Sequence, residues 1–405
     1  MMKTLKTFPY GFKSRLKAGV KVRFVLILIF MVSNYAAFAQ KPAAENVSRY
    51  ISHLKNKRTG LTANHTTLVG NEHLLDVLLK NNINVVKIYA PEHGFRGTAG
   101  AGEIVDDSKD KKTGIPVISL YGNNKKPTKE QLSGIDCMVF DMQDAGARFY
   151  TYLSTMHYIM EACAENDIPL FVLDRPNPNG FYIDGPVLDP SCRSFVGMHT
   201  IPVVHGMTLG ELALMINAEK WLAGERQCNL TVVPCVDYTH LSKYKLPVPP
   251  SPNLPDMQAI YLYPTLCFFE GTPLSVGRGT DFPFKVIGHP NLKNNKKYEF
   301  SFIPKSNDGK LKPLLEGQVC YGKDFRNADV NVSEINIDQI IEIYKDYEPK
   351  EGFFKKIFSL LAGNKILQQQ IAEGKSSKEI RESWQKDLEK FKEKRKKYLL
   401  YPDFY

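Results

Sequence analysis

Glu92 is the residue of this sequence whose type and setting point most directly to catalysis. It follows the apolar run Val85–Tyr89 and lies between Pro91 and His93, ahead of the glycine-rich segment 94–102. Partial burial at such a point favours the protonated carboxyl group at neutral pH, as a general acid requires. The alternative is a structural role, in which the carboxylate accepts backbone N–H groups of that segment. We predict catalysis, since perturbed carboxyl groups in clefts are often functional.

A second carboxyl group is normally needed to hydrolyse a glycosidic bond, about 5–5.5 Å away for retention or about 6.5–9.5 Å away for inversion. The candidates are Asp141, Asp144, Asp174, Glu270 and Asp281. Asp141 and Asp174 directly follow apolar runs, so a parallel sheet would bring them close to Glu92. We predict that these two take part in catalysis. Helix capping, or pairing with Arg148 or Arg175, is the alternative for both.

Polar and ionisable side chains follow five apolar runs in succession. The carboxyl ends of parallel strands meet at one edge of a sheet, where ligands bind in open α/β folds. We therefore predict a substrate site at that edge. Its predicted residues are Asn64, His93, Arg96, Gln143, Asp144, Arg148, Tyr150, Arg175, Asn177, His205, Glu270, Arg278 and Asp281.

Four arginines of this set, Arg96, Arg148, Arg175 and Arg278, lie in segments expected to be loops. A guanidinium group binds a carboxylate with two parallel hydrogen bonds. Structural ion pairs are the alternative for each arginine. Taken together, the four predict an anionic ligand.

Metal and cofactor motifs are weak in this sequence. Glu92 and His93 with Asp141 and Asp144 offer a metal-binding alternative, but no H-E-x-x-H spacing occurs. The glycines between residues 97 and 102 are not followed by a Walker lysine, and there is no G-x-S-x-G elbow. We predict neither a metal nor a nucleotide cofactor, and no serine nucleophile.

The elements that must position these residues alternate between strands and helices. Predicted strands are Leu61–Ala63, Val85–Tyr89, Val117–Leu120, Cys137–Phe140, Leu170–Leu173 and Leu230–Val233. Several are unbroken apolar runs, as expected of strands buried on both faces. Predicted helices are a leucine-rich helix at 74–79 capped by Asn71, Tyr152–Ala164, and Leu209–Ala218 with Thr208 and Glu211 as a capping box. The pattern predicts a Rossmann-like, doubly wound α/β domain over residues 40–245.

A smaller α/β domain is predicted over residues 246–405, after the proline-rich linker 247–252. Its predicted elements are a helix at Met257–Phe269, a loop at Glu270–Pro290, strands at Tyr298–Ile303 and Gln318–Tyr321, and a final helix with the apolar stripe Ile380, Trp384, Leu388 and Phe391. The basic segment 390–397 is interrupted by acidic residues, so we expect a solvated helix face and no nucleic-acid binding.

Residues 1–39 have the pattern of a secretory signal peptide. Seven basic residues precede the apolar run Phe24–Val32, and Ala37-Phe38-Ala39 offers a cleavage site. The run is too short for a bilayer core of about 30 Å, so we expect no membrane span after cleavage and a periplasmic or secreted protein. Removing seven basic and no acidic residues lowers the net charge from +10 to +3.

The seven cysteines contain no C-x-x-C motif and predict no disulfide framework. Cys137 and Cys163 lie in apolar runs and are expected in the core. Cys228 and Cys235 are the one pair considered for a disulfide in an oxidising compartment.

Six segments resemble those of one family, the exo-β-N-acetylmuramidases, long described as a domain of unknown function. They are Ala90–Gly97, Phe140–Tyr152, Leu173–Pro178, Asp184–Pro186, His205–Thr208 and Glu270–Thr280. The resemblance runs from about Gly60 to the terminal Tyr-Leu-Leu-Tyr-Pro segment. It implies a Rossmann-like domain, a smaller C-terminal domain and a site in the cleft between them.

The resemblance also implies release of N-acetylmuramic acid (MurNAc) from the non-reducing end of peptidoglycan fragments. The family's catalytic glutamate, in Pro-Glu-His-Gly, corresponds to Glu92. The lactyl carboxylate of MurNAc would suit the arginines, with Arg278 supplied by the second domain. The expected partners are peptidoglycan-derived disaccharides and muropeptides. A non-catalytic sugar- or muropeptide-binding protein and a metal-dependent hydrolase stay open as alternatives, as do the second carboxyl group and the oligomeric state.

Overall fold

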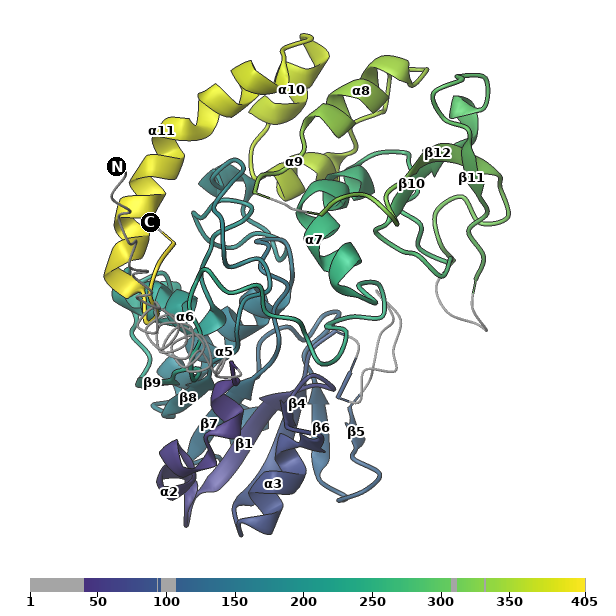
Figure 1. The fold of residues 1–405 in the computed structure, drawn as a ribbon. Helices are drawn as coiled ribbons and strands as arrows, with labels where there is room; N and C mark the ends of the chain where they lie inside the picture. Colours follow the sequence, from purple (N-terminus) through teal and green to yellow (C-terminus); the bar gives the residue numbers. More distant parts are fainter. Residues whose placement is uncertain (1–39, 93, 96–106, 307–311, 331–332, 405) are drawn as a thin grey trace, which may run out of the picture. The chain divides into compact units, whose positions relative to one another are not determined.

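A seven-stranded sheet organises the first half of the chain (Figure 1). Its strands are β1 (Arg58–Ala63), β4 (Asn84–Ala90), β5 (Ser108–Lys109), β6 (Pro116–Ser119), β7 (Cys137–Asp141), β8 (Leu170–Leu173) and β9 (Leu230–Val233). Their order is β5-β6-β4-β1-β7-β8-β9, and all neighbours pair in parallel except β5 with β6. The six parallel strands thus have the Rossmann order 3-2-1-4-5-6. The predicted fold class and all six predicted strands are confirmed.

The computed structural model describes residues 40–92, 94–95, 107–306, 312–330 and 333–404. Residues 40–405 form one compact unit. The predicted signal peptide and the predicted site residues His93 and Arg96 lie outside the described residues. No helix in the described part of the chain is long and apolar enough to cross a membrane.

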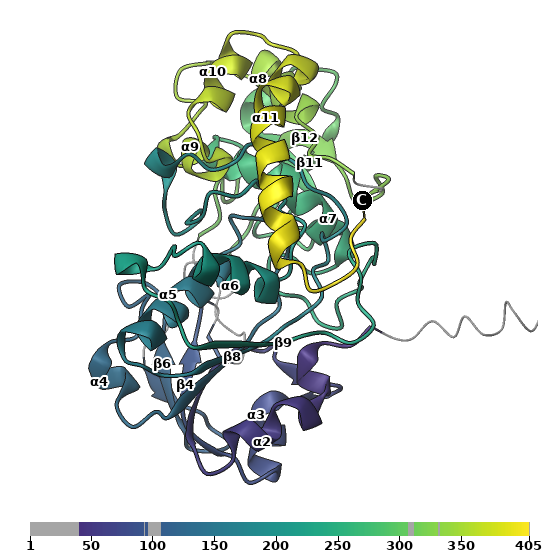
Figure 2. The same ribbon diagram turned by 90° about the vertical axis from the view of Figure 1, so that its left-hand side faces the viewer.

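Helices cover both faces of the sheet (Figure 2). Cys137 and Val139 of β7 pack with the core under α2 (Ile51–Leu54) and α3 (Leu74–Lys80). The alternate residues Met138 and Phe140 pack with the core under α5 (Tyr152–Glu165) and α6 (Leu209–Ala218). Burial on both faces explains why these strands are continuous apolar runs. The remaining short elements here are the β2–β3 hairpin (Leu68–Val69, Glu72–His73) and α4 (Lys129–Leu132).

Of the two predicted helix caps, the one at α6 is confirmed and the one at α3 was wrong. At α6 the Thr208 hydroxyl accepts the Glu211 N–H and the Glu211 carboxylate accepts the Thr208 N–H, so the predicted capping box is present. At α3 the cap is His73, whose Nδ1 accepts the Leu75 N–H at 3.1 Å. The prediction of Asn71 failed because residues 72–73 form β3 first.

The second half of the chain combines helices with a three-stranded antiparallel sheet of order β10-β12-β11. Its elements are α7 (Met257–Leu266), β10 (Val286–His289), β11 (Phe300–Phe302), β12 (Cys320–Asp324), α8 (Asp338–Asp346), α9 (Lys356–Ala362), α10 (Ile366–Ala372) and α11 (Ser377–Arg395). The α-helix predicted to reach Phe269 ends at Leu266 and continues as a 3-10 turn, Cys267–Gly271. Sequence analysis missed β10, which lies within the predicted loop, and also α8, α9 and α10.

The last helix, α11, buries the predicted stripe and returns the chain to the first sheet. Ile380, Trp384, Leu388 and Phe391 are all buried. Arg395, fully buried at the end of the helix, donates to the Gly206 carbonyl and pairs with Asp403 at 2.6 Å.

All seven cysteines are buried and free. Cys137 and Cys163 are core residues, as predicted. The disulfide considered between Cys228 and Cys235 does not form.

Candidate active site

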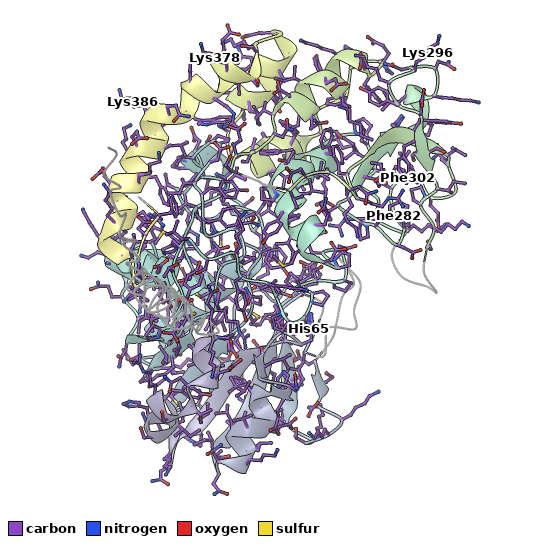
Figure 3. All side chains as sticks on the ribbon, viewed as in Figure 1. His65, Phe282, Lys296, Phe302, Lys378 and Lys386 are labelled. Carbon is purple, nitrogen blue, oxygen red and sulfur yellow. The ribbon has the colours of Figure 1, made fainter. Side chains whose placement is uncertain are left out.

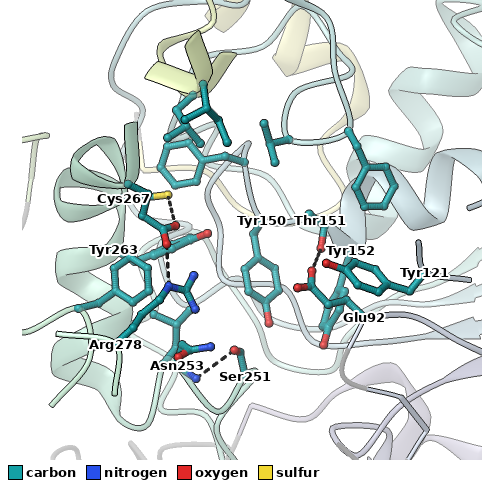
Figure 4. A pocket seen from close by; sticks show the side chains of 18 of the residues that line it. Glu92, Tyr121, Tyr150, Thr151, Tyr152, Ser251, Asn253, Tyr263, Cys267 and Arg278 are labelled. Atoms are coloured by element: carbon teal, nitrogen blue, oxygen red, sulfur yellow. Dashed lines mark hydrogen bonds and ion pairs between the residues drawn. The ribbon is translucent and has the colours of Figure 1, made fainter. Parts of the chain in front are cut away.

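A cavity of about 640 Å³ lies beside the carboxyl end of the sheet and is bounded by both halves of the chain. Its lining residues come from the strand ends and α5, from segment 251–254, from α7 and the loop after it, and from α9 (Figure 4). They are Glu92, Tyr121, Gly122, Lys125, Phe149, Tyr150, Thr151, Tyr152, Phe195, Val196, Ser251, Asn253, Leu254, Tyr263, Cys267, Glu270, Arg278, Phe284, Ile357 and Leu361. Four of the predicted site residues are among them: Glu92, Tyr150, Glu270 and Arg278.

Glu92 follows β4 and is half-buried at the cavity wall. The Thr151 hydroxyl donates to its Oε2 at 3.3 Å. Burial raises the pKa of Tyr121 to about 12, and the charge of Glu92 and a hydrogen bond with it add to this shift. Tyr121 therefore keeps its proton, and its hydroxyl can donate a hydrogen bond to Glu92. Figure 4 shows both hydroxyl groups next to the carboxyl group.

Glu270 is the second carboxyl group of the cavity. It lies in the 3-10 turn after α7, and its Oε1 accepts from Arg278 Nε at 2.7 Å. Cys267 Sγ is 3.6 Å from Oε2. The Arg278 guanidinium also lies 5.1 Å from the centre of the Phe284 ring. In Figure 4 Arg278 and Cys267 are on the wall opposite Glu92.

Three tyrosines form an aromatic wall of the cavity. The ring of Tyr150 meets those of Tyr152 and Tyr263 edge to face, with centroids 4.8 and 6.1 Å apart. The hydroxyl groups of Tyr150 and Tyr152 both donate to the carbonyl of Pro250. Such rings combine an apolar face with a fixed polar end, which suits a sugar.

The proline-rich segment 247–252, predicted to be a linker, contributes to the wall of the cavity. His65, which follows β1 and is labelled in Figure 3, shares a 2.8 Å hydrogen bond with the Pro249 carbonyl. Ser251 of this segment and the nearby Asn253 line the cavity. The proline-rich segment is thus a fixed component of the site, where sequence analysis expected only a connection.

Asp141 and Arg175 do not reach the cavity, because they bind each other. Both are buried, and Arg175 donates to the two carboxylate oxygens of Asp141 at 2.5 and 2.8 Å. Arg175 Nη2 also donates to the Leu68 carbonyl. The predicted catalytic role of Asp141 and the predicted substrate contact of Arg175 are therefore not supported by their positions. The structural alternative, an ion pair, is what is found.

Asp174 is also buried away from the cavity lining. Its carboxylate accepts from Thr208 Oγ1, the Tyr401 hydroxyl and the Gly210 N–H at the start of α6. Gly210 permits this approach, since a Cβ atom there would lie 2.6 Å from Asp174 Cγ. Burial raises the pKa of Asp174 to about 6, against the opposing effect of these hydrogen bonds. Asp174 caps a helix, which was its alternative role.

The predicted amide residues serve the loops beneath the cavity. Asn64 accepts the Thr66 N–H, Gln143 donates to the Asp144 and Pro176 carbonyls, and Asn177 donates to the Met207 carbonyl. Asp281 is exposed and outside the cavity lining. The three amide residues hold strand-end loops in place, and they do not line the cavity.

Arg148 is buried and donates to the carbonyl groups of Pro186, Ile201 and Leu361. Burial lowers its pKa to about 9. It joins the first domain to α9 and does not line the cavity. His205 is buried too, and its Nδ1 accepts the Met207 N–H. Burial lowers its pKa to about 3, so it is neutral at physiological pH.

The metal alternative required Glu92 and His93 to meet Asp141 and Asp144. Asp141 is occupied by Arg175, and His93 lies outside the described residues. Within the described residues no group of three His, Cys, Asp or Glu side chains is arranged to hold a metal ion.

Asp144 is a buried carboxyl group whose ionisation affects the stability of the protein. Its Oδ2 accepts the Gly146 N–H, and its Oδ1 has no hydrogen-bond partner among the described residues. Burial raises its pKa to about 7. The folded protein therefore keeps this proton to higher pH than the unfolded chain, and the resulting stability is lost as pH rises from about 4 to about 7.

Asp144→Asn removes this titration. We expect its free energy of unfolding, relative to wild type, to be higher at pH 8 than at pH 4.5 by roughly 2–4 kcal/mol. Urea denaturation at the two pH values measures the difference, with the exposed Asp281→Asn as control. An equal effect at both pH values would contradict the shifted ionisation of Asp144.

Comparisons with known proteins agree with this fold. Models of the N-terminal and C-terminal parts of the exo-β-N-acetylmuramidase NamZ match residues 59–258 and 261–401. The chain is 40% identical to the peptidoglycan β-N-acetylmuramidase NamZ of Bacillus subtilis (strain 168), over 87% of the chain and 89% of that protein. The predicted domain boundary at residues 245–246 stays a prediction.

Two solved structures of DUF1343 family proteins from Bacteroides fragilis NCTC 9343 are also similar. One is 48% identical with a TM-score of 0.83, covering 90% of this chain and 99% of its own. The other is 30% identical with a TM-score of 0.77, covering 89% and 99%. Fold, cavity and relatives define a glycoside hydrolase with a Rossmann-like domain. The chain belongs to the exo-β-N-acetylmuramidase (NamZ) family.

Some cavity residues escaped the sequence analysis. Tyr121, Gly122 and Lys125 follow the third predicted strand but were not placed in the site. Thr151 lies within the segment that carried the resemblance. Extending the strand-end search by a few residues would have found all four. Phe195 and Tyr263 carry no comparable signal, because their contribution depends on how distant segments pack.

Proposed function

We propose that this muramidase releases MurNAc from the non-reducing end of peptidoglycan fragments such as MurNAc-GlcNAc, with Glu92 as the general acid. The observation that carries the proposal is that two carboxyl groups, Glu92 and Glu270, line one cavity, with Arg278, the partner of Glu270, on the wall opposite Glu92 (Figure 4). Glycosidases use such a pair on either side of the scissile bond. Glu92 would protonate the leaving oxygen, and the Thr151 and Tyr121 hydroxyls would fix its orientation.

Glu270 is the second catalytic carboxyl group in this proposal, in place of Asp141 or Asp174. Its ion pair with Arg278 requires a negatively charged carboxylate. A fixed negative charge stabilises the positive charge that develops on the sugar ring during bond cleavage. Asp141 and Asp174 are committed to Arg175 and to the start of α6.

The size of the cavity supports action on a chain end. Its volume of about 640 Å³ is in the usual range for small-molecule sites, roughly 300–1,000 Å³. Residues of both halves of the chain bound it, from Glu92 of the sheet domain to Ile357 of α9. A terminal sugar and its neighbour fit such a space better than a continuous polymer.

Export to the periplasm or medium is part of the proposal, because murein fragments occur there. Its support is the basic segment, the apolar run and the Ala37-Phe38-Ala39 site of residues 1–39. Cell fractionation of the full chain, with N-terminal sequencing of the exported protein, tests it; a cytoplasmic protein that begins at Met1 would contradict it.

The activity is tested by incubating residues 40–405 with MurNAc-GlcNAc and separating the products by chromatography. Equimolar free MurNAc and GlcNAc are expected. Disaccharide binding in a calorimeter without any product would contradict the proposal and favour a binding protein.

Glu270→Gln keeps the shape of the side chain but removes its charge. We expect kcat for MurNAc-GlcNAc to fall roughly 100-fold, because transition-state charge stabilisation is lost. Circular dichroism and the melting temperature serve as folding checks. Glu299→Gln, at an exposed glutamate of the same half of the chain, is the matched control. Turnover within a factor of two of wild type would remove Glu270 from the mechanism.

A further inference from the structure

Of the four arginines expected to bind the substrate carboxylate, Arg96 lies outside the described residues and the other three have other partners. Arg148 and Arg175 do not line the cavity, and Arg175 is neutralised by Asp141. Arg278 does line it, but its charge is balanced by Glu270 at 2.7 Å, although its Nη1 has no hydrogen-bond partner among the described residues. None of the three described arginines therefore brings an unbalanced charge to the cavity. A lining cation without a counter-charge is the stronger candidate partner for an anionic substrate.

Lys125 is the lysine of the cavity lining, and sequence analysis did not consider it. It lies between β6 and α4, is half-buried, and holds its Nζ 4.7 Å from the centre of the Phe195 ring. The neighbouring Lys126 is paired with Glu161 and Glu165, each at 2.7 Å. Within the described part of the chain, Lys125 forms no such ion pair.

The contact with Phe195 orients the ammonium group without using its hydrogen-bond donors. A cation–π contact is made through the charge, so the three N–H groups can still bind an anion. The Phe195 ring is itself stacked near Tyr158, at 6.2 Å between centroids. Phe195 also lines the cavity and shields one side of the ammonium group from water. Partial exclusion of water strengthens a charge-assisted hydrogen bond.

Lys125 lines the same cavity as the proposed acid. It is four residues beyond Tyr121, which is hydrogen-bonded to Glu92. A sugar bound in this cavity with its glycosidic oxygen at Glu92 can therefore present a ring substituent to Lys125. MurNAc differs from N-acetylglucosamine by a lactyl ether, and the carboxylate of that ether is its only charge.

We propose that Lys125 binds the lactyl carboxylate of the terminal MurNAc and so selects this sugar over N-acetylglucosamine. The inference rests on the proposed function and names the residue that determines its sugar specificity. Where the lactyl group carries a stem peptide, the carboxylate is replaced by a neutral amide. The contact with Lys125 is then lost.

The test compares three 4-nitrophenyl glycosides: that of MurNAc, that of its lactamide, which has the same shape without the charge, and that of N-acetylglucosamine. For Lys125→Met we expect kcat/KM on the MurNAc glycoside to fall roughly 10- to 100-fold, mainly through KM, by loss of a charge-assisted bond. Rates on the two neutral glycosides should change less than twofold. Lys125→Arg should restore part of the loss, and the exposed Lys129→Met should resemble wild type.

Two outcomes would overturn the inference. An equal loss on all three glycosides would mean that Lys125 only supports the fold, and no loss on any would mean that the carboxylate binds elsewhere. Calorimetry of free MurNAc and its lactamide with wild type and Lys125→Met gives a readout independent of turnover. A wild type that binds MurNAc through Lys125 but releases none from MurNAc-GlcNAc would refute the proposed function and leave this inference standing.

Discussion

Glu92→Gln is expected to lower kcat for MurNAc-GlcNAc by about 10³-fold or more while the protein remains folded. A positioned general acid contributes roughly 10²–10⁴-fold, and the natural disaccharide needs it because its leaving group is a poor one. Glutamine keeps the shape of the side chain and can still accept the Thr151 hydroxyl, 3.3 Å from Oε2 in the wild type. The substitution thus removes the transferable proton and little else. Quenched-flow or discontinuous product assays measure the residual rate.

A substrate with an activated aryl leaving group shows whether the lost function of Glu92 is proton donation. If Glu92 is the acid, Glu92→Gln should recover much of its rate on an aryl glycoside whose leaving group needs no protonation. The disaccharide should still bind with a Kd near that of the wild type. Glu130→Gln, at an exposed glutamate of α4, controls for the change in charge. Unimpaired turnover of the disaccharide would exclude Glu92 from the mechanism.

Asp141→Asn is expected to lower the free energy of unfolding by about 3–5 kcal/mol, the usual cost of leaving one buried charge without its partner. Asp141 is fully buried and holds Arg175 through two hydrogen bonds at 2.5 and 2.8 Å. An asparagine can accept only one of them and leaves the guanidinium uncompensated. The shift in urea midpoint at constant m-value measures the loss.

The same variant distinguishes a structural Asp141 from the catalytic one that the sequence suggested. If its role is to hold Arg175, the folded fraction of Asp141→Asn should keep a kcat close to wild type. The double variant Asp141→Asn/Arg175→Gln should be less destabilised than the sum of its single variants, because both charges are gone. Additive effects, or a large fall in kcat with unchanged stability, would contradict the ion-pair account.

Much of the sheet could be predicted because its strands are buried on both faces. A short, unbroken apolar run such as Leu170–Leu173 is typical of a strand that is buried on both faces. Here the observed bounds are the predicted ones. The capping box of α6 could also be predicted, because Thr208 and Glu211 are three residues apart and form reciprocal hydrogen bonds. β10 was missed because Val286–His289 is only four residues long and follows a glycine-rich loop.

The site could be predicted in part, for a related reason. Strand order and direction correctly brought Glu92 to the cavity beside the sheet. Asp141 and Asp174 also end strands, but which side chains meet beyond the strand end is decided by partners far away in the sequence. Arg175, which follows the next strand, forms an ion pair with Asp141, and Tyr401 donates a hydrogen bond to Asp174 from 227 residues further along the chain. No local sequence pattern predicts such partners.

The segment after α11 completes the hydrogen bonding of the sheet domain. The Tyr401 hydroxyl and the Leu400 N–H bind the buried carboxylates of Asp174 and Glu211, and Arg395 binds the Gly206 carbonyl. These contacts join residues 189 to 227 positions apart in the sequence. Because contacts between such distant residues require the closure of long loops, we expect the docking of this segment to be a slow step in folding.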